Sequence, residues 1–193
     1  MRAFLSYDIS DPDFLARVQH LQSELKSTGA DLKLVSPQIM HFTIRFLGEI
    51  EKPEKDQIVA ALQGKVENFE LDLNFKGMGA FPDDRRISVV WIGIDPSSAA
   101  VLEKEANQIN TLLNSIPTLS GRKEERFSPH ITISRVRSGK NKEKLADFLR
   151  QHRHDDFGKT KISNLRLKLS ELRPSGPEYS DLHVFEKAVE PGH

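Results

Sequence analysis

Two hydrophobic periods alternate along the chain, one typical of helices and the other typical of strands. Apolar residues between Phe14 and Leu25 recur every three or four positions, which predicts a helix with one buried face. Asp11 and Pro12 come just before it and suit a helix start, as a cap and a first-turn residue. The elements predicted for this half are strands at 3–9, 32–35, 41–46 and 69–75 and helices at 14–26 and 53–66.

The second half of the chain shows a similar order of elements. Its first strand runs into Asp95-Pro96, just as the first strand of the chain runs towards Asp11-Pro12. The elements predicted here are strands at 87–94, 130–136 and 162–172, helices at 99–113 and 142–152, and a last extended stretch at 182–188 after a turn at 174–177. This internal repeat, at about 1–80 and 81–193, predicts two lobes related by a pseudo-twofold axis.

The same order predicts the fold class and the domain organisation. It favours an α+β fold in which each lobe is a largely antiparallel sheet with covering helices, and in which the active-site cleft lies between the lobes. No linker or low-complexity stretch separates the two halves. We therefore expect a single domain over residues 1–193.

Composition narrows the class of protein. The chain is 37% hydrophobic and 29% charged, which is typical of a soluble globular protein, and it has no apolar run long enough for a membrane helix. It contains no cysteine, which excludes thiol nucleophiles, thiolate metal sites and disulfides. Its 28 basic and 28 acidic residues balance, which favours an RNA end or a small phosphorylated ligand over a long nucleic acid. We expect a cytoplasmic monomer.

A short motif, His-x-Thr, occurs at 41–43 and again at 130–132. A single copy in a strand arises easily by chance and is usually structural. The two copies here are 89 residues apart, and each occupies the same place in its repeated unit. This pairing favours one catalytic site built from His41 and His130.

Strand geometry gives the motifs a direction, because residues two apart point to the same face. The residues expected on the motif face are His41, Thr43 and Arg45 in one strand and His130, Thr132 and Ser134 in the other. The residues expected to point into a core are Phe42, Ile44, Phe46, Ile131 and Ile133. Two such strands related by a twofold axis would surround one cavity with two imidazoles and two hydroxyls.

That arrangement meets the needs of an in-line displacement at phosphorus. One side requires a base for the attacking water, and the other requires an acid for the departing oxygen. An imidazole can do either near neutral pH, and each transfer contributes about 10² to 10⁴-fold. Threonine hydroxyls can donate to the phosphate oxygens. A strained cyclic phosphate needs no metal ion, so we expect no metal and no cofactor.

The chain resembles the 2H phosphoesterase superfamily, and within it the bacterial and archaeal RNA 2′,3′-cyclic phosphodiesterase / 2′-5′ RNA ligase family. The stretches that carry the resemblance are RAFLSYDIS, HFTIRFLGEI, FPDDRRISVVWIGID, FSPHITISRVR and LRLKLSELRPSGPEY. They are spread over nearly the whole chain. The resemblance implies a single two-lobed 2H phosphoesterase domain that opens a 2′,3′-cyclic phosphate, on RNA 3′ ends or cyclic nucleotides, to a 2′-phosphate.

The resemblance also implies a role for each residue of the site. His41 would donate a proton to the leaving 3′-oxygen, and His130 would accept the proton of water; the residues alone leave these two roles symmetric. Thr43 and Thr132 would bind the phosphate. Arg135 matches a basic position that contacts substrate, although strand parity places it on the face away from His130, so this role needs a bend in the strand.

Other residues are candidates for roles near this site. Arg45 has the parity to serve the phosphate, with a salt bridge as the alternative. Loop cations that could collect RNA phosphates at the mouth of the cleft are Arg85, Arg86, Arg122, Lys123 and Arg126. Trp91 is expected to be a core residue. His152 and His154 have metal-like spacing, but their polar surroundings favour a solvated helix end.

Two further functional hypotheses stay open at this point. The site could run in reverse and join a cyclic phosphate to a 5′-hydroxyl, as a 2′-5′ ligase, although hydrolysis by abundant water should dominate. Alternatively, the chain could be a non-catalytic module that binds RNA ends bearing a cyclic phosphate. Turnover of a cyclic nucleotide separates the enzyme from the binding module.

Overall fold

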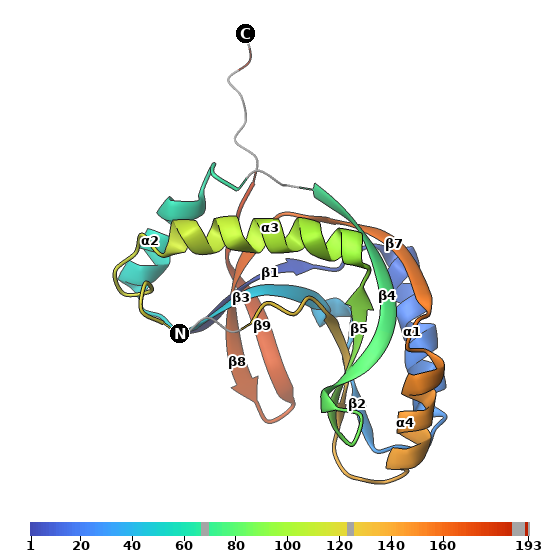
Figure 1. The fold of residues 1–193 in the computed structure, drawn as a ribbon. Helices are drawn as coiled ribbons and strands as arrows, with labels where there is room; N and C mark the ends of the chain where they lie inside the picture. The colour runs from blue at the N-terminus through green and yellow to red at the C-terminus, as the bar shows by residue number, and fades with distance from the viewer. Residues whose placement is uncertain (67–69, 123–125, 187–191, 193) are drawn as a thin grey trace.

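Two antiparallel sheets make up the framework of the computed structural model, which describes residues 1–66, 70–122, 126–186 and 192 (Figure 1). Sheet A has the strand order β3 (His41–Glu49), β1 (Arg2–Asp8), β8 (Arg166–Arg173) and β9 (Gly176–Val184). Sheet B has the order β2 (Leu32–Leu34), β6 (Ile131–Val136), β5 (Arg86–Ile94), β4 (Glu70–Asp83) and β7 (Asp156–Ser163). Together with the helices, these sheets confirm the predicted α+β class.

Helices lie against both sheets in the described part of the chain. They are α1 (Pro12–Lys26), α2 (Lys52–Leu62), α3 (Pro96–Leu113) and α4 (Lys142–Gln151), with a short 3-10 turn, η1 (Pro37–Ile39), before β3. In sheet B, α1 contacts β7 and β6, and α4 contacts β4. Beside α2, α3 runs along sheet A, where the Tyr7 hydroxyl of β1 donates to the Glu105 carboxylate (Figure 1). Burial raises the pKa of Glu105 to about 7.

The helix starts follow the predicted capping. The Asp11 carboxylate accepts hydrogen bonds from the amides of Asp13 and Phe14, and Pro12 is the first residue of α1. At α3 the Asp95 carboxylate accepts from the Ser98 amide. Each bond satisfies a donor that the first helical turn would otherwise leave unpaired.

The two halves of the chain interleave in space. From the first half, β1 and β3 belong to sheet A, whereas β2 and β4 belong to sheet B. From the second half, β5, β6 and β7 belong to sheet B, whereas β8 and β9 return to sheet A. Each sheet is therefore complete only when both halves of the chain are present.

Several predicted boundaries in the C-terminal part are wrong. The single strand expected at 162–172 is two strands, β7 and β8, because Asn164 turns the chain with a φ of +60°. The turn expected at 174–177 is the tip of the β8–β9 hairpin, and β9 begins at Gly176, earlier than the expected stretch at 182–188. Of that stretch, residues 187 and 188 lie outside the described residues.

The strand predicted at 69–75 is also longer than expected; Phe69 itself lies outside the described residues. As β4 it continues to Asp83, with a register shift between Phe75 and Met78. Gly77 lies within that shift at a φ of +81°, and a Cβ there would come within 2.7 Å of the Arg153 carbonyl. A glycine that reads as a turn in the sequence is here a bulge inside a strand.

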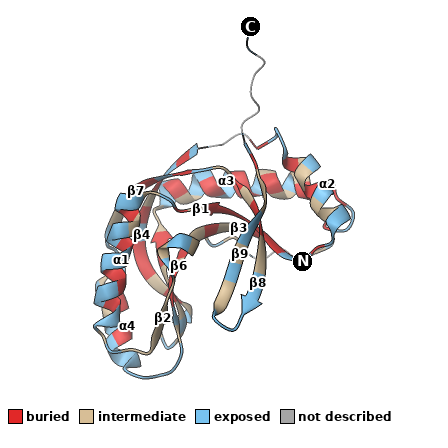
Figure 2. Ribbon diagram, turned by 180° about the vertical axis from the view of Figure 1, so that it is seen from behind, coloured by how far each residue is buried: buried red, intermediate tan, exposed pale blue. Residues whose placement is uncertain are grey.

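Buried residues line the surfaces where helices meet sheets (Figure 2). The largest fully buried side chains include Tyr7, Phe14, Phe42 and Phe75, which come from both sheets and from α1. The β8–β9 hairpin projects beyond the rest of sheet A, and Leu172 near its tip is 75% exposed. Across the described ranges, every helix falls short of the combined length and apolarity that crossing a membrane requires.

Candidate active site

Each motif histidine stands at the start of a strand and is held by its own backbone. His41 opens β3, and His130 directly precedes β6. The His41 Nδ1 lies 2.9 Å from the Ile39 carbonyl oxygen, and the His130 Nδ1 lies 2.6 Å from the Ser128 carbonyl oxygen. Because a carbonyl only accepts, Nδ1 carries the hydrogen in both rings. Both neutral imidazoles therefore present a free lone pair at Nε2.

Burial lowers the pKa of both imidazoles below the ordinary value of 6.5. For each ring, the hydrogen bond to the backbone carbonyl opposes this effect. The Asp8 carboxylate also raises the pKa of His41, while the charges of Lys168 and His130 lower it. Asp8 thus distinguishes the two rings, since only His41 shows the influence of a carboxylate.

The two imidazoles belong to one site. The charge of His130 reaches His41 strongly enough to lower its pKa, and β3 and β6 are in contact although they belong to different sheets. Thr43 and Thr132 are half-buried, like the two histidines, and lie two positions further along the same strands. The structure therefore brings together the four motif residues that the sequence singled out.

A β-bulge in β3 changes the predicted parity after Thr43. Ser6 of β1 pairs with Thr43, but its neighbour Leu5 pairs with Arg45, so Ile44 is an extra residue. Ile44 and Arg45 are consequently both buried, at 6% and 9% exposure. The Arg45 Nη1 donates to the Asn110 Oδ1 of α3 at 2.9 Å. The idea that Arg45 serves the phosphate is therefore wrong.

Phe46 moves in the opposite direction because of the same bulge. Strand parity predicts that it points into the core, but it is 57% exposed. Its ring lies 6.1 Å from that of Phe4, which in turn lies 5.1 Å from the His41 ring. Phe46 therefore lies on the face of sheet A that carries the motif.

A second bulge occupies the same place in β6. Trp91 pairs with Thr132 and Val90 pairs with Ser134, so Ile133 is the extra residue. Ser134 is fully buried, and the prediction that it shares the motif face is wrong. Arg135, the next residue, returns to the motif face and is exposed.

The bulge is the bend that a substrate contact by Arg135 requires. The Arg135 charge lowers the pKa of Tyr179 in β9, which burial otherwise raises, so the guanidinium points towards sheet A. Arg135 and Phe46 occupy equivalent positions after the two bulges, each five residues beyond its histidine. The role of Arg135 remains a prediction, and its position no longer opposes that role.

Aromatic rings flank both histidines. Tyr179 stands edge-on to His41 with ring centroids 5.0 Å apart, and Phe81 stands edge-on to His130 at 4.9 Å. Phe4 adds a second ring beside His41. These contacts exclude water from one side of each imidazole, and they account for the burial that lowers the two pKa values.

Trp91 lies on the motif face of sheet B and not in the core, so its predicted place is wrong. It pairs with Thr132 across the β5–β6 ladder, and its ring centroid is 6.5 Å from that of His130. A Cβ at Gly79 would fall within 2.2 Å of the indole, so the indole lies directly on the glycine backbone. A continuous apolar run conceals this outward direction, because it gives no alternation to read.

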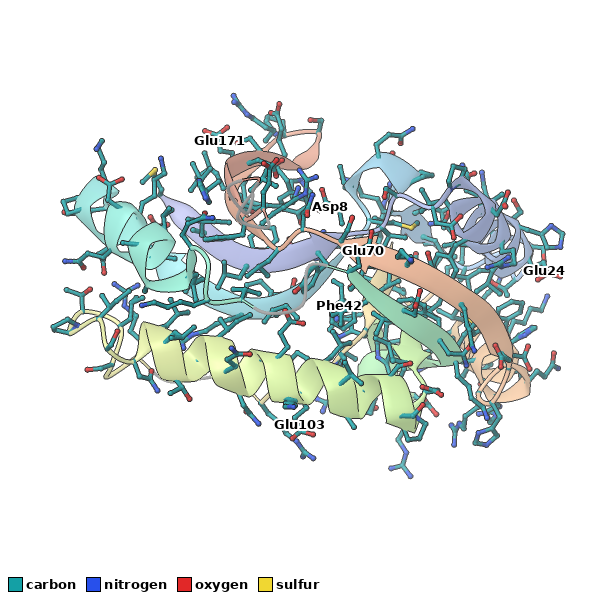
Figure 3. The ribbon with its side chains drawn as sticks, turned by 90° about the horizontal axis from the view of Figure 1, so that it is seen from above. Asp8, Glu24, Phe42, Glu70, Glu103 and Glu171 are labelled. Atoms are coloured by element: carbon teal, nitrogen blue, oxygen red, sulfur yellow. The ribbon has the colours of Figure 1, made fainter. Side chains whose placement is uncertain are left out.

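An ionic cluster beside His41 was not predicted from the sequence. The Lys168 Nζ lies 3.0 Å from Asp8 and 3.1 Å from Asp181, and Arg166 pairs with both carboxylates. Asp8 is also the register partner of His41. Figure 3 places Asp8 near the middle of the molecule, whereas Glu24, Glu103 and Glu171 lie towards its edges. The period-two spacing of Arg166 and Lys168 is the signal that could have revealed this cluster.

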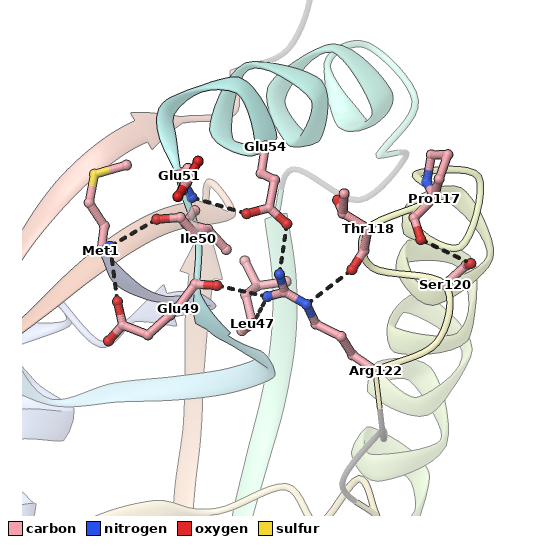
Figure 4. Close-up of polar contacts among 10 residues, drawn as sticks. All are labelled: Met1, Leu47, Glu49, Ile50, Glu51, Glu54, Pro117, Thr118, Ser120 and Arg122. Atoms are coloured by element: carbon pink, nitrogen blue, oxygen red, sulfur yellow. Dashed lines mark hydrogen bonds and ion pairs between the residues drawn. The ribbon is translucent and has the colours of Figure 1, made fainter.

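Arg122 is a structural residue and not a loop cation for RNA. Its guanidinium donates to the carbonyl oxygens of Leu47, Glu49 and Thr118 and to the Glu54 carboxylate, the last at 2.7 Å (Figure 4). Of the other proposed loop cations on this side, Arg126 is exposed, and Lys123 lies outside the described residues.

The histidine pair with metal-like spacing does not gather further ligands. The His152 Nδ1 lies 2.5 Å from Asp155 at the end of α4, and the ring packs on Phe148. His154 is exposed. Among the residues that the structure describes, no group of three or more imidazole and carboxylate side chains is arranged to hold a metal ion.

A buried pair of imidazoles, one from each of two antiparallel sheets, defines the 2H phosphoesterase class. Residues 3–181 match the model of the AKAP7 2'5' RNA ligase-like domain, and the chain belongs to that family.

Relatives match along almost their whole length. An RNA 2′,3′-cyclic phosphodiesterase of Methanothermobacter thermautotrophicus is 32% identical over 187 residues, covering 96% of this chain and 98% of the relative. One of Archaeoglobus fulgidus is 34% identical over 190 residues, covering 96% and 100%.

Solved structures share the fold. TT0787 of Thermus thermophilus superposes with a TM-score of 0.76 at 21% identity, covering 96% of this chain and 97% of that one. Escherichia coli LigT in apo form gives 0.70 at 21% identity, covering 95% of each chain. LigT has also been solved in complex with 3′-AMP and with ATP.

Proposed function

We propose that this chain hydrolyses the 2′,3′-cyclic phosphate at the end of an RNA, or of a nucleotide, to a 2′-phosphomonoester without a metal ion. The observation that carries the proposal is the pair of buried imidazoles held in the same tautomer, His41 by Ile39 and His130 by Ser128. The relatives named RNA 2′,3′-cyclic phosphodiesterase, which match nearly the full chain, support the substrate class. The enzyme acts as a cytoplasmic monomer in this proposal.

The reaction is a single displacement at phosphorus. His130 Nε2 takes a proton from water as the water oxygen bonds to phosphorus. The bond from phosphorus to the 3′-oxygen breaks, and His41 donates its Nε2 proton to that oxygen. The product carries the phosphate on its 2′-oxygen, and proton exchange with solvent resets both rings.

The Asp8 carboxylate supports this assignment of roles. It stabilises the imidazolium form of His41, and that form is the one an acid needs. His130 shows only burial and its backbone hydrogen bond, which suits a base that begins neutral. The negative charge of the substrate would further favour a proton on one ring, so binding would help to load the acid.

The threonines and Arg135 would act on the phosphate itself. Thr43 and Thr132 lie one on each sheet beside the histidines, and their hydroxyls would donate to the two non-bridging oxygens. Arg135 projects from β6 towards sheet A and would stabilise the charge that grows on those oxygens. Loss of Arg135 would therefore weaken both binding and turnover.

The test is product analysis on 2′,3′-cyclic AMP and on an oligonucleotide with a cyclic end, with chelator present. We expect the 2′-phosphate alone, and a loss of about 10² to 10⁴-fold in kcat for His41→Ala and for His130→Ala. His20→Ala, which removes an exposed histidine on α1, is the matched control. Full activity in either motif variant would contradict the proposal, and tight binding without turnover would favour the binding module.

Reverse ligation remains a second activity of the same proposed site. The matched family model is described as 2'5' RNA ligase-like. A 5′-hydroxyl can replace water as nucleophile, with the same acid and base acting in the opposite direction. Incubation of paired RNA halves should yield a 2′-5′ junction in small amount beside the hydrolysis product, and the junction should disappear in His41→Ala.

A further inference from the structure

A cavity of about 570 Å³ opens at the end of sheet B that is remote from the histidines. It lies where the β4–β5 turn, the end of β6 and the start of α4 come together (Figure 1). From His130, β6 runs six residues to Val136 in the cavity wall, a distance of about 20 Å in an extended strand. The cavity is therefore separate from the site where the reaction is proposed.

Cations dominate the rim of this cavity. Arg85 and Arg86 come from the β4–β5 turn, Arg137 from the end of β6 and Lys142 from the first residue of α4. Within the described ranges, Arg85, Arg137 and Lys142 take part in no ion pair, and Arg86 pairs only with the exposed Asp83, at 3.8 Å.

Two carboxylates in the wall only partly offset that charge. Asp84 is already paired with Arg153 of the α4–β7 segment, which lies beside the cavity. Glu143 lies in the first turn of α4, whose N-terminal amides add positive potential. The rim thus has excess positive charge suited to a phosphate group.

The inner wall is apolar and comes from both layers of sheet B. Ile87 of β5 and Val136 of β6 face Leu145 and Ala146 of α4. An apolar wall beside a cationic rim matches a nucleotide, which has an aromatic base and an anionic phosphate, better than it matches inorganic phosphate alone.

Arg135 links this cavity to the histidine site. It lies on β6 between His130 and Arg137, and it is exposed on the motif face. Cations therefore follow β6 from the proposed site of the cyclic phosphate to the cavity. An RNA strand held at its 3′ end by the histidines would find positive charge along this path.

We propose that the cavity binds a nucleotide of the RNA chain upstream of the cyclic phosphate, so that oligonucleotides are better substrates than cyclic mononucleotides. This inference rests on the proposed function. It assigns Arg85 and Arg137 to substrate length and not to chemistry. A protein of zero net charge then holds its RNA through a few cations gathered at one end of sheet B.

The test compares a cyclic mononucleotide with a cyclic-ended oligonucleotide in wild type and in Arg85→Ala/Arg137→Ala. Both side chains are exposed, so the variant should keep its fold. We expect KM for the oligonucleotide to rise about tenfold, with a salt dependence reduced by about 0.7 per lost phosphate contact. Kinetics on the mononucleotide should not change.

The matched control is Arg150→Ala/Arg173→Ala, which removes the same charge from exposed pairs elsewhere. An equal rise of KM in the control, or a rise for the mononucleotide, would overturn the inference. If wild type hydrolyses neither substrate, the proposed function fails, and anisotropy with an uncyclised oligonucleotide still tests the cavity: unchanged affinity in Arg85→Ala/Arg137→Ala overturns it. Saturable AMP binding that depends on these arginines, without any effect on the oligonucleotide, would overturn it too and assign the cavity to free nucleotides instead.

Discussion

At the scale of single residues, the two histidines are alike in tautomer and differ in electrostatic surroundings. His41 has the Asp8 and Lys168 charges close to it, whereas His130 has mainly aromatic neighbours such as Phe81. A symmetric motif therefore gives rise to an asymmetric pair. The sequence predicted the pair but not the asymmetry, because Lys168 reaches the site only through the pairing of β1 with β8.

The pH profile should show the effect of burial on both imidazoles. One ring must be protonated and the other neutral, so kcat/KM should be bell-shaped with its maximum midway between the two pKa values. Burial lowers both pKa values below 6.5, so the maximum should lie below pH 6.5. Initial rates on 2′,3′-cyclic AMP at low substrate concentration measure this profile, and a maximum above pH 7 would contradict it.

The same profile tests which histidine is the acid. In Asp8→Asn the pKa of His41 should fall further, and the optimum should move to lower pH. If His41 is the acid, kcat/KM at pH 7 should fall severalfold, because less imidazolium remains. If His41 were the base, activity at pH 7 would hold. Asp181→Asn, at the other carboxylate of Lys168, is the matched control.

At the scale of elements, strand parity predicts a site correctly only as far as the first bulge. His41, Thr43, His130 and Thr132 lie before the bulges and share the predicted faces. Arg45, Phe46, Ser134 and Arg135 lie beyond them and are all reversed. A bulge depends on pairing with another strand, and the sequence of one strand does not disclose it.

Arg122 shows how one side chain holds several elements together. It joins the segment after α3 to the end of β3 and to Glu54 in the first turn of α2 (Figure 4). Arg122→Ala should lower the free energy of unfolding by about 1–2 kcal/mol, because it leaves carbonyl acceptors unpaired while the side chain itself is partly solvated. Urea unfolding measures this loss, with the exposed Arg150→Ala as control. Equal stability in the two variants would contradict the role.

At the scale of the whole molecule, the interleaved halves should behave as one cooperative unit. Sheet A needs β8 and β9 from the end of the chain, and sheet B needs β2 and β4 from its beginning. The order of elements predicted the α+β class, but it does not reveal which sheet each strand joins, because sheet membership is set by contacts distant in sequence. The single domain expected over 1–193 is consistent with this arrangement.

Unfolding should therefore follow one transition. Trp91, the single tryptophan, reports on sheet B by fluorescence, and far-ultraviolet circular dichroism reports on all helices and strands. We expect the two urea curves to coincide in midpoint and slope. Separate transitions would show that the sheets unfold independently and would contradict the single unit.

The paired bulges also bear on how related sequences are aligned. A strand has a reading frame of two, and a bulge is a one-residue insertion that shifts it. A relative that lacks a residue equivalent to Ser134 would keep Arg135 on the motif face, because the deletion and the lost bulge cancel. A gap at this point in an alignment of β6 thus preserves the site, whereas an ungapped strand without the bulge would turn the arginine away.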